Sequence, residues 1–531
     1  MRPMNMQKAL LKTRLLLAAI VAALSLSATV HAAAPGITGP TFNLTAQPAY
    51  LTQPDGQSIY SWGYGCNGAP AGFAPKPGGA NLANATCNTM QVPGPTLIVT
   101  EGVPVTVNLT NNLPSAAGNT SILFSGLNVT ASGGVVGLLT NEAAPGGTVT
   151  YKFTATSPGT RAYYSGTQGD LQVEMGLYGA VIVLPSAAPA NCNTGLAAQN
   201  LAAEAHWGET DFRLANAAYD NAKTCYDREY LFQFSEMDPS IHSQARLQVA
   251  ATTGCVAGAA GCGLSVRTEP YHPAYFMVNG RSMPDDMDPN YLPAYPHQPY
   301  NGNPHMHPGE QVLIRVIGQG RWQHPFHEHG NHVRILGRDG NLILSATDPT
   351  QLAGPLLFTT TTTPGMAFDG IFYWTGKGLN WDAYGHNSTS GDASAKLPCT
   401  PDANGYNTGA PNAINYYEWC QDHNKPLQAA PFGDVAGGGP ATLPDANILT
   451  NGAWYGGSPY LGPDATVRAT GPTGTTPPSG TIANSPTGEA GFAFMWHSHN
   501  EREITTNNAF PGGMLMMMLV DSREFVIDES N

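Results

Sequence analysis

Charged side chains are scarce in this 531-residue chain, where Lys, Arg, Asp and Glu together make up 11% of the residues, against about 25% in typical soluble proteins. Basic residues are the scarcer kind, with 23 against 37 acidic ones and a formal net charge of −14 at pH 7. Nucleic acid is therefore not an expected partner, because contact with phosphates needs a basic surface. Gly and Pro are abundant instead, with 61 and 44 residues, which predicts a chain rich in turns and loops.

Long apolar runs are missing beyond the first 32 residues. Residues 1–32 begin with Arg2 and Lys8, continue through an apolar run over about 15–28 and end with small residues near Ala32. This order is typical of a cleaved secretory signal, with a membrane anchor as the less favoured alternative. No later segment approaches the roughly 18 consecutive apolar residues of a transmembrane helix. We therefore expect a secreted protein, periplasmic or extracellular, without a membrane span after the signal is cleaved.

Eight cysteines in an exported chain favour disulfide bonds. A soft metal site is the alternative, but it requires tight cysteine spacings or a neighbouring histidine, and none of the eight has either. Proximity in the sequence suggests which cysteines pair. The predicted disulfides join Cys66 with Cys87, Cys192 with Cys225, Cys255 with Cys262, and Cys399 with Cys420.

Strand-like segments dominate the rest of the sequence. Short β-rich runs such as Val103 to Leu109 and Thr148 to Phe153 alternate with turn signals, and no long segment has the 3.6-residue period of a helix. This pattern predicts an all-β fold, and a weak internal repeat suggests two copies of one sandwich. The predicted organisation is a first domain over 33–187, a linker over 188–224, and a second domain over 225–531 with a long loop-rich insertion at about 376–487.

The 15 histidines are distributed very unevenly. His31 leaves with the predicted signal, and the next histidine is His206, so the predicted first domain contains none. Six histidines in the second domain gather in two short motifs. These motifs are His324-Pro-Phe-His327-Glu-His329-Gly-Asn-His332 and His497-Ser498-His499.

Each His-x-His pair predicts two imidazoles on the same face of a strand, because strand side chains alternate with period two. Two such pairs on neighbouring strands can converge into one site. His327, His329, His497 and His499 would then offer four nitrogen ligands. Such a set suits copper, with zinc the less favoured metal, and does not suit calcium or magnesium. The competing interpretation treats each histidine as an ordinary hydrogen-bonded polar residue.

Two further motifs could also handle copper. His305 and His307 precede a Pro-Gly turn and are expected to be exposed loop residues, with copper delivery as the alternative. The methionine-rich run from Met514 to Leu519 could bind Cu(I) through thioethers. We expect it to form the last core strand instead, because methionine fills irregular cores well.

These motifs together resemble the multicopper oxidases, the cupredoxin-domain family that includes laccases. The first domain resembles that family in Pro93-Gly94-Pro95-Thr96 and Gly176-Leu177-Tyr178-Gly179, and the second in His324 to Gly330 and in His497 to His499 followed by Gly513-Met514. The resemblance implies two cupredoxin-like Greek-key β-sandwiches and a copper-dependent oxidoreductase.

The resemblance also assigns copper ligands, and the chain departs from the pattern. It gives His324 to a mononuclear type 1 copper, and it gives His327, His329, His497 and His499 to a trinuclear cluster. The cysteine that should bind the type 1 copper is Ser498 here, and the next type 1 histidine falls on Glu503. A serine hydroxyl cannot replace the thiolate of such a site. The type 1 site is therefore expected to be absent.

The first-domain half of the trinuclear cluster is missing as well. The family's histidine motifs correspond to Leu123 to Gly126 and Ala162 to Gly166, which contain no histidine. Two assemblies stay open, a homo-oligomer and a complex with a partner protein that supplies the missing copper ligands, and a trinuclear site would need the partner protein. The first domain of a neighbouring copy has no histidine to offer. The glutamates expected to orient the remaining imidazoles are Glu328, Glu501 and Glu503.

Three functions follow from these motifs. The favoured one is a secreted copper-binding protein of this family with a residual histidine site and without laccase activity. The alternative is an active copper-dependent oxidoreductase that uses a mononuclear copper or is completed by a partner subunit. A zinc hydrolase with Glu501 or Glu503 as the base has the least support.

Overall fold

A computed structural model describes residues 34–75, 85–377, 400–413, 415–421, 457–461, 482–483, 491–523 and 525–527. The predicted signal over 1–32 and most of the predicted insertion over 376–487 lie outside these residues. Within the described ranges, no helix is both long enough and apolar enough to cross a membrane.

The first sandwich consists of short strands between residues 36 and 184. They are β1 (Gly36–Thr38), β2 (Thr41–Thr52), β3 (Ser58–Cys66), β4 (Gly72–Ala74), β5 (Leu97–Thr100), β6 (Pro104–Asn111), β7 (Leu123–Phe124), β8 (Thr130–Gly133), β9 (Val135–Val136), β10 (Asn141–Glu142), β11 (Thr148–Thr154), β12 (Gly159–Tyr164) and β13 (Tyr178–Leu184). One sheet has the order β4-β1-β5-β13-β12-β7 and the other β3-β2-β6-β11-β8, while β9 pairs with β10. Val149, Tyr151 and Phe153 on β11 alternate with exposed or half-buried neighbours, and they point into the core between the sheets.

The second sandwich follows from residue 228 onward. Its strands are β14 (Arg228–Met237), β15 (Tyr275–Val278), β16 (His305–Met306), β17 (Gln311–Gly318), β18 (His324–Glu328), β19 (Val333–Arg338), β20 (Asn341–Leu342), β21 (Leu356–Leu357), β22 (Thr359–Thr362), β23 (Ala367–Tyr373), β24 (Gly457–Leu461), β25 (Ile482–Ala483), β26 (Gly491–Ser498) and β27 (Leu515–Asp521). The two sheets have the orders β15-β14-β17-β23-β19-β20 and β16-β27-β26-β18-β22, with β21, β24 and β25 at their margins. The predicted all-β fold is confirmed, and many neighbouring strands are distant in sequence, as a Greek key requires.

The methionine-rich run forms the last strand of this core, as predicted. Met514, Met516 and Met518 are fully buried, and they pack with Phe326 and Trp496 between the two sheets. A thioether site for Cu(I) is therefore not needed to explain the run.

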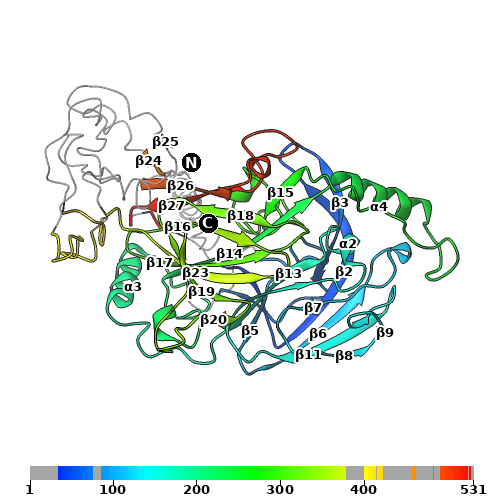
Figure 1. Ribbon diagram of the computed structural model, residues 1–531, viewed down its shortest axis with the longest axis horizontal. Helices are drawn as coiled ribbons and strands as arrows, with labels where there is room; N and C mark the ends of the chain where they lie inside the picture. The colour runs from blue at the N-terminus through cyan, green and yellow to red at the C-terminus, as the bar shows by residue number, and fades with distance from the viewer. Residues whose placement is uncertain are drawn as a thin grey trace, which may run out of the picture.

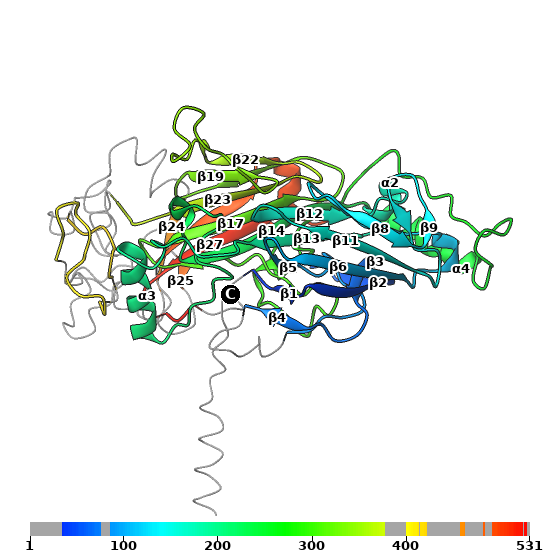
Figure 2. The ribbon, with the colours of Figure 1, turned by 90° about the horizontal axis from the view of Figure 1, so that it is seen from below.

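Helices α3 (Leu196–Trp207) and α4 (Pro239–Ala251) lie at opposite ends of the molecule (Figures 1 and 2). Asp238 caps the N-terminus of α4, and its carboxylate accepts a hydrogen bond from Ser240 N. Although α4 follows β14 of the second sandwich, Ile241 and Ala245 are buried in the core of the first. His242 also contacts the first sandwich, with ring nitrogens 2.6 Å from Tyr60 O and 3.1 Å from Glu174 O. The helix therefore ties the two sandwiches together.

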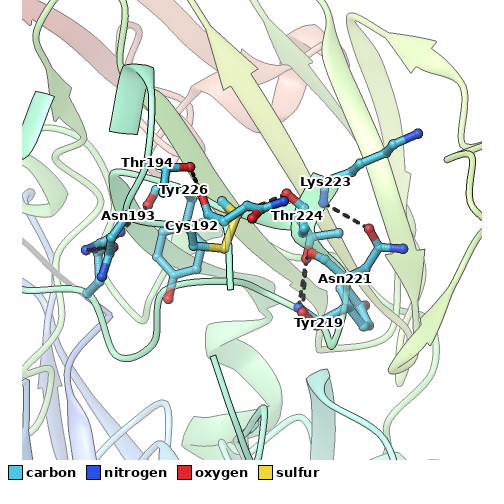
Figure 3. The surroundings of a disulfide bond; sticks show 12 residues. Cys192, Asn193, Thr194, Tyr219, Asn221, Lys223, Thr224 and Tyr226 are labelled. Atoms are coloured by element: carbon cyan, nitrogen blue, oxygen red, sulfur yellow. Dashed lines mark hydrogen bonds between the residues drawn. A yellow bond between two sulfur atoms is a disulfide. The ribbon is translucent and has the colours of Figure 1, made fainter. Parts of the chain in front are cut away.

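Three predicted disulfides are confirmed, and they join Cys66 with Cys87, Cys192 with Cys225, and Cys255 with Cys262. Figure 3 shows Cys192 next to the turn that carries Asn221, where the chain enters β14. Cys420 is disulfide-bonded too, and its predicted partner Cys399 lies outside the described residues.

Asp369 on β23 forms the central polar contact between the two sandwiches. Its carboxylate accepts hydrogen bonds from Thr160 N at 3.0 Å and from Tyr219 Oη at 2.7 Å. Arg315 lies 3.5 Å from the same carboxylate and also pairs with Glu229 at 2.8 Å. The side chains of these five residues are all buried. Their contribution to stability therefore depends on each charged or polar group keeping its partner.

Replacing Asp369 with Ala should lower the free energy of unfolding by about 3 kcal/mol, because it leaves Thr160, Tyr219 and part of the Arg315 charge without their buried acceptor. Urea denaturation followed by tryptophan fluorescence would measure this loss. Asp170→Ala, at an exposed position, is the control and should cost less than about 1 kcal/mol. Equal losses in the two variants would contradict the role given to Asp369.

Candidate metal centre

The two His-x-His pairs lie on adjacent antiparallel strands. In the pairing of β18 with β26, His327 stands directly opposite His497. The pairing continues past the strand ends, where His329 N donates to Met495 O and His499 N donates to Pro325 O. Because side chains alternate along each strand, all four imidazoles project from the same face of the sheet.

The four rings converge, as the spacing predicts. The ring centroid of His327 lies 4.8 Å from that of His329, 5.4 Å from that of His497 and 4.9 Å from that of His499. Nε2 of His329 is 3.3 Å from Nε2 of His497. His327, His329 and His497 each offer a nitrogen, and these three atoms lie within 4.8 Å of one another. We call His327, His329 and His497 the tight trio. The tight trio and His499 together form the histidine quartet.

Burial keeps two rings of the quartet, those of His327 and His497, neutral near pH 7. His327 is buried, and burial together with the charges of the three neighbouring histidines lowers its pKa to about 4. Burial also lowers the pKa of His497. His499 is at the edge, with half of its side chain exposed. Neutral imidazole is the form that binds a metal, so the rings of His327 and His497 are ready to bind one near neutral pH.

One hydrogen bond fixes the tautomer of His497. Its Nδ1 lies 2.7 Å from the carbonyl oxygen of Ser498, which can only accept a hydrogen bond. Nδ1 therefore carries the proton, and the lone pair is on Nε2, the atom that faces His329. Nδ1 of His327 is similarly bound to Thr359 Oγ1 at 2.6 Å. Such contacts through the second ring nitrogen are typical of metal-binding histidines.

The geometry of the quartet fits copper or zinc. Two imidazole nitrogens about 2.0–2.1 Å from a tetrahedral metal are separated by about 3.3 Å, and the Nε2 atoms of His329 and His497 are 3.3 Å apart. The ligand set contains only neutral nitrogen donors, which calcium and magnesium do not favour. His327, His329 and His497 would hold the ion, and His499 would complete the set.

His324, which the sequence places among the metal ligands, lies elsewhere. It is on the opposite face of β18 from His327, fully buried, and its two ring nitrogens donate to Glu236 at 2.9 Å and Glu503 at 2.8 Å. Burial disfavours the charged ring, but these two carboxylates outweigh burial and raise the pKa of His324 to about 9. An imidazolium has no lone pair to offer to a metal. His324 therefore forms a buried ion-pair network instead of a metal site.

The three glutamates that were predicted to orient the imidazoles lie in three different environments. Glu503 accepts hydrogen bonds from His324 and from Ser498 Oγ, so it belongs to the ion-pair network. Glu328 stands opposite Trp496 on the core side of β18, where burial raises the pKa of its carboxyl well above the usual value. Glu501 is near the quartet, 3.6 Å from Nδ1 of His499, with both side chains largely exposed.

Thr359 and Phe358 belong to the surroundings of the quartet but were not predicted from the sequence. Thr359 on β22 pairs directly with His327, and the ring of Phe358 lies 5.7 Å from the His327 ring. Glu236 was missed in the same way, because it contacts His324 across 88 residues of sequence. Only the threonine-rich run over 359–362 gave a signal, and it indicates a strand rather than a contact.

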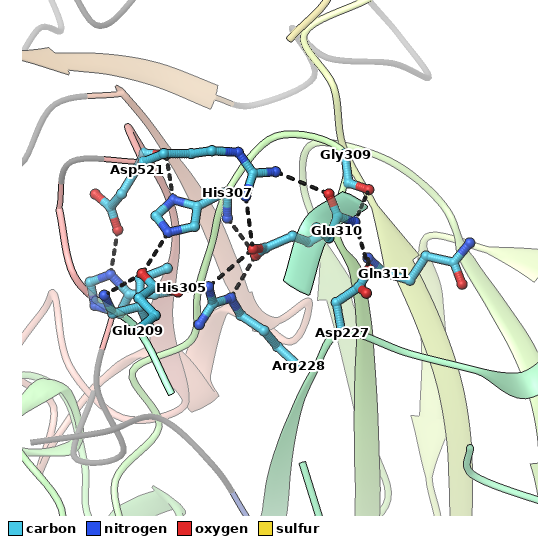
Figure 4. A network of polar contacts seen from close by, with 12 residues as sticks. Glu209, Asp227, Arg228, His305, His307, Gly309, Glu310, Gln311 and Asp521 are labelled. Atoms are coloured by element: carbon cyan, nitrogen blue, oxygen red, sulfur yellow. Dashed lines mark hydrogen bonds and ion pairs between the residues drawn. The ribbon is translucent and has the colours of Figure 1, made fainter. Parts of the chain in front are cut away.

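The expectation for His305 and His307 was wrong. Both are buried, because His305 lies on β16, which pairs in parallel with β27. His305 binds the Asp521 carboxylate and Nε2 of His307 lies 2.8 Å from Glu209 (Figure 4). The same network includes charged groups from β14 and from the turn that precedes β17. They are Arg228 and Glu310, with Arg228 paired to both Glu209 and Glu310. Because Arg228 neutralises carboxylates of this network, we interpret the network as one that stabilises the fold.

Two β-sandwiches with a histidine quartet on the second define an all-β protein with a candidate metal centre. Residues 76–188 match the family model described as multicopper oxidase. This part of the chain is therefore similar to a multicopper oxidase domain, and the match supports the family predicted from the motifs. This match lies almost wholly within the first sandwich, which has no histidine.

Curated relatives match the chain over a short region. Laccase abr2 of Aspergillus fumigatus is 38% identical over 98 residues, which are 18% of this chain and 16% of that protein. Multicopper oxidase MCE of Talaromyces pinophilus is 38% identical over 98 residues, or 18% of this chain and 15% of its own. The matched region therefore spans only about one sixth of the length of these relatives.

Solved structures align over more of the chain. The multicopper oxidase mgLAC is 16% identical with a TM-score of 0.44, and the alignment covers 91% of this chain and 86% of that one. Blue copper oxidase from Nitrosomonas europaea is 15% identical with a TM-score of 0.43, covering 90% and 85%.

The His324 network predicts how stability depends on pH. The folded state holds a proton on His324 up to about pH 9, whereas the unfolded chain releases it near pH 6.5. The stability that this histidine contributes is therefore complete below about pH 6.5 and is lost as the pH rises through about 9. Urea midpoints measured at about pH 6, 7.5 and 9 should fall steadily for the wild type.

His324→Gln should flatten this fall, since Gln does not titrate. His272→Gln, at an exposed position, is the matched control and should keep the wild-type slope. An unchanged slope in His324→Gln would show that another group causes the pH dependence.

Proposed function

We propose that this chain is an exported copper-binding protein that holds one copper ion in the histidine quartet and lacks laccase activity. The observation that carries the proposal is the convergence of three imidazoles, with the Nε2 atoms of His329 and His497 separated by 3.3 Å. Bound copper would supply one-electron redox chemistry there. The protein's own contribution is to hold the rings neutral, oriented and partly shielded from water.

Laccase activity would require a second, electron-accepting copper, and the residues at the corresponding positions do not favour one. His324, Ser498 and Glu503 stand at those positions and are bound to each other. A protonated imidazole, a hydroxyl and a carboxylate lack the soft thiolate that a blue-copper site uses. The first sandwich, moreover, contributes no histidine to a multinuclear cluster.

Accessibility of the quartet supports association with another protein or another copy of the chain. His499 is half exposed, and Phe358 beside His327 is 41% exposed. A partner could therefore add ligands from the open side. Such completion would give the alternative function, an active copper-dependent oxidoreductase.

Export is proposed from two independent features. The order of basic, apolar and small residues over 1–32 is typical of a secretory signal. The three described disulfides also favour an oxidising compartment such as the periplasm or the extracellular space.

Purified protein loaded with copper and then dialysed should retain about one copper per chain by elemental analysis. His327→Ala and His497→Ala should each lose nearly all of it, because each removes a ligand from the tight trio. His332→Ala is the matched control, since His332 belongs to the same sequence motif but contacts the Phe358 ring edge to face instead of joining the trio. It should retain copper.

The same samples separate the two functions. Copper loss in His332→Ala equal to that in His327→Ala would refute the assigned ligands. Three or more coppers per chain, with dioxygen uptake on addition of a phenol, would refute the proposed function and favour an active oxidase.

Ser498→Cys should not create an intensely blue protein. The new thiol would lie beside Glu503 and His324, which already bind each other in a fully buried network. Visible absorption of the copper-loaded variant is the measurement, and Ser498→Ala is the control for loss of the hydroxyl. A strong blue band in Ser498→Cys would show that a type 1 site can still form here.

A further inference from the structure

The two sandwiches enclose a pocket that neither the histidine quartet nor the polar contact at Asp369 uses. Its volume is about 290 Å³, near the lower end of the roughly 300–1,000 Å³ of ligand pockets in proteins. It lies where the first sandwich meets the β17–β18 and β22–β23 connections of the second. The lining residues that matter here are Leu123, Leu139, Tyr164, Gly169, Val173 and Gln319.

The pocket coincides with the positions where the family resemblance places first-domain copper ligands. Leu123, Tyr164 and Gly166 occupy three of those positions and line the pocket. None of the three is a histidine in this chain. Across the pocket they face Gln319 and Pro364 of the second sandwich. The space is therefore bounded by groups that suit an organic molecule better than an ion.

The chemistry of the walls selects a neutral ligand. Among the described residues, no ionised side chain lines the pocket, so a charged ligand would lose its hydration without gaining a partner there. Leu123, Val173 and Pro364 supply apolar walls, and Tyr164 supplies an aromatic ring for stacking. Backbone at Gly320 and Gly365, both with positive φ, adds surface without side chains.

Gln319 adds a specific hydrogen-bonding group. It is 2% exposed, and its amide nitrogen donates to Gly179 O at 3.0 Å and to Gln233 Oε1 at 3.1 Å. Those bonds fix the orientation of the amide. The side-chain oxygen of Gln319 can therefore accept a hydrogen bond from an N–H or O–H group of a ligand.

Exposed leucines mark the entrance. Leu139 lines the pocket although 63% of it is exposed, and the adjacent Leu138 is 93% exposed. Val136 on β9 is 91% exposed in the same hairpin. Exposed apolar groups gathered beside a cavity are typical of ligand-binding sites.

We propose that the pocket between the sandwiches binds a neutral aromatic molecule of one or two rings that carries a hydrogen-bond donor. Indole is the probe that matches this description, with its ring packed against Leu123 and Tyr164 and its N–H directed to Gln319. The site is independent of the proposed copper function, because none of its residues belongs to the histidine quartet.

Calorimetric titration of the full-length protein with indole should show saturable binding. Indene has the same shape without the N–H, and it should bind about tenfold more weakly because the acceptor on Gln319 is left unpaired. Benzoate, a charged single ring, should show no saturable binding. Absence of saturable indole binding, or equal affinity for indole and indene, would overturn the proposal.

Gly169→Leu should reduce indole affinity at least about tenfold, since Gly169 lines the pocket and a Cβ there meets no atom within 4 Å. The position begins helix α2 (Gly169–Gln172) without a positive φ, so the backbone accepts a side chain. Gly263→Leu is the control, because Gly263 is equally open and does not line the pocket. It should bind indole like the wild type.

A second pair of variants tests the same site in case Gly169→Leu does not fold. Leu139→Asp places a carboxylate at the entrance and should weaken indole binding, whereas Leu138→Asp changes the neighbouring exposed leucine and should not. Urea midpoints followed by tryptophan fluorescence, measured on all four variants, should stay near the wild-type value and so report an intact fold. Wild-type indole affinity in both Gly169→Leu and Leu139→Asp would refute this location for the site.

Discussion

The antiparallel pairing of β18 with β26 is the constraint on which the chemistry of this protein depends. It sets His327 opposite His497, and burial of Phe326 and Trp496 on the other face holds that register. A slip by one residue would move every side chain to the opposite face and remove Phe326 from the hydrophobic core. The hydrophobic core therefore positions the histidine quartet, even though no histidine of the quartet belongs to that core.

The same alternation creates two different electrostatic environments on one strand. On the outer face, burial and neighbouring rings keep His327 neutral. On the inner face, Glu236 and Glu503 keep His324 protonated. Neutral rings can bind a metal, whereas the protonated ring satisfies two buried carboxylates. In multicopper oxidases, as the resemblance describes them, both faces serve copper. Here only the outer face retains groups suited to it.

Local patterns predicted a large part of this arrangement. Strand alternation and turn signals predicted two β-sandwiches, and nearness in sequence predicted three disulfides that the structure contains. The convergence of the two His-x-His pairs also followed from the alternation of side chains along a strand. The environment of His305 did not, because its burial depends on parallel pairing of β16 with β27, more than 200 residues away. Thr359 and Glu236 were missed because their contacts with His327 and His324 join segments that lie 32 and 88 residues apart in the sequence.

Sequence alone determined the all-β class, the family and the four ring positions of the quartet, because each rests on local spacing or on a short motif. Tertiary structure alone decided which histidines are neutral and which are charged, since the pKa of a ring depends on burial and on charges brought near it by distant segments. His324 and His327 are three residues apart in one motif, yet their pKa values are about 9 and about 4. The pocket between the sandwiches likewise exists only after Leu123 and Gln319 have been brought together.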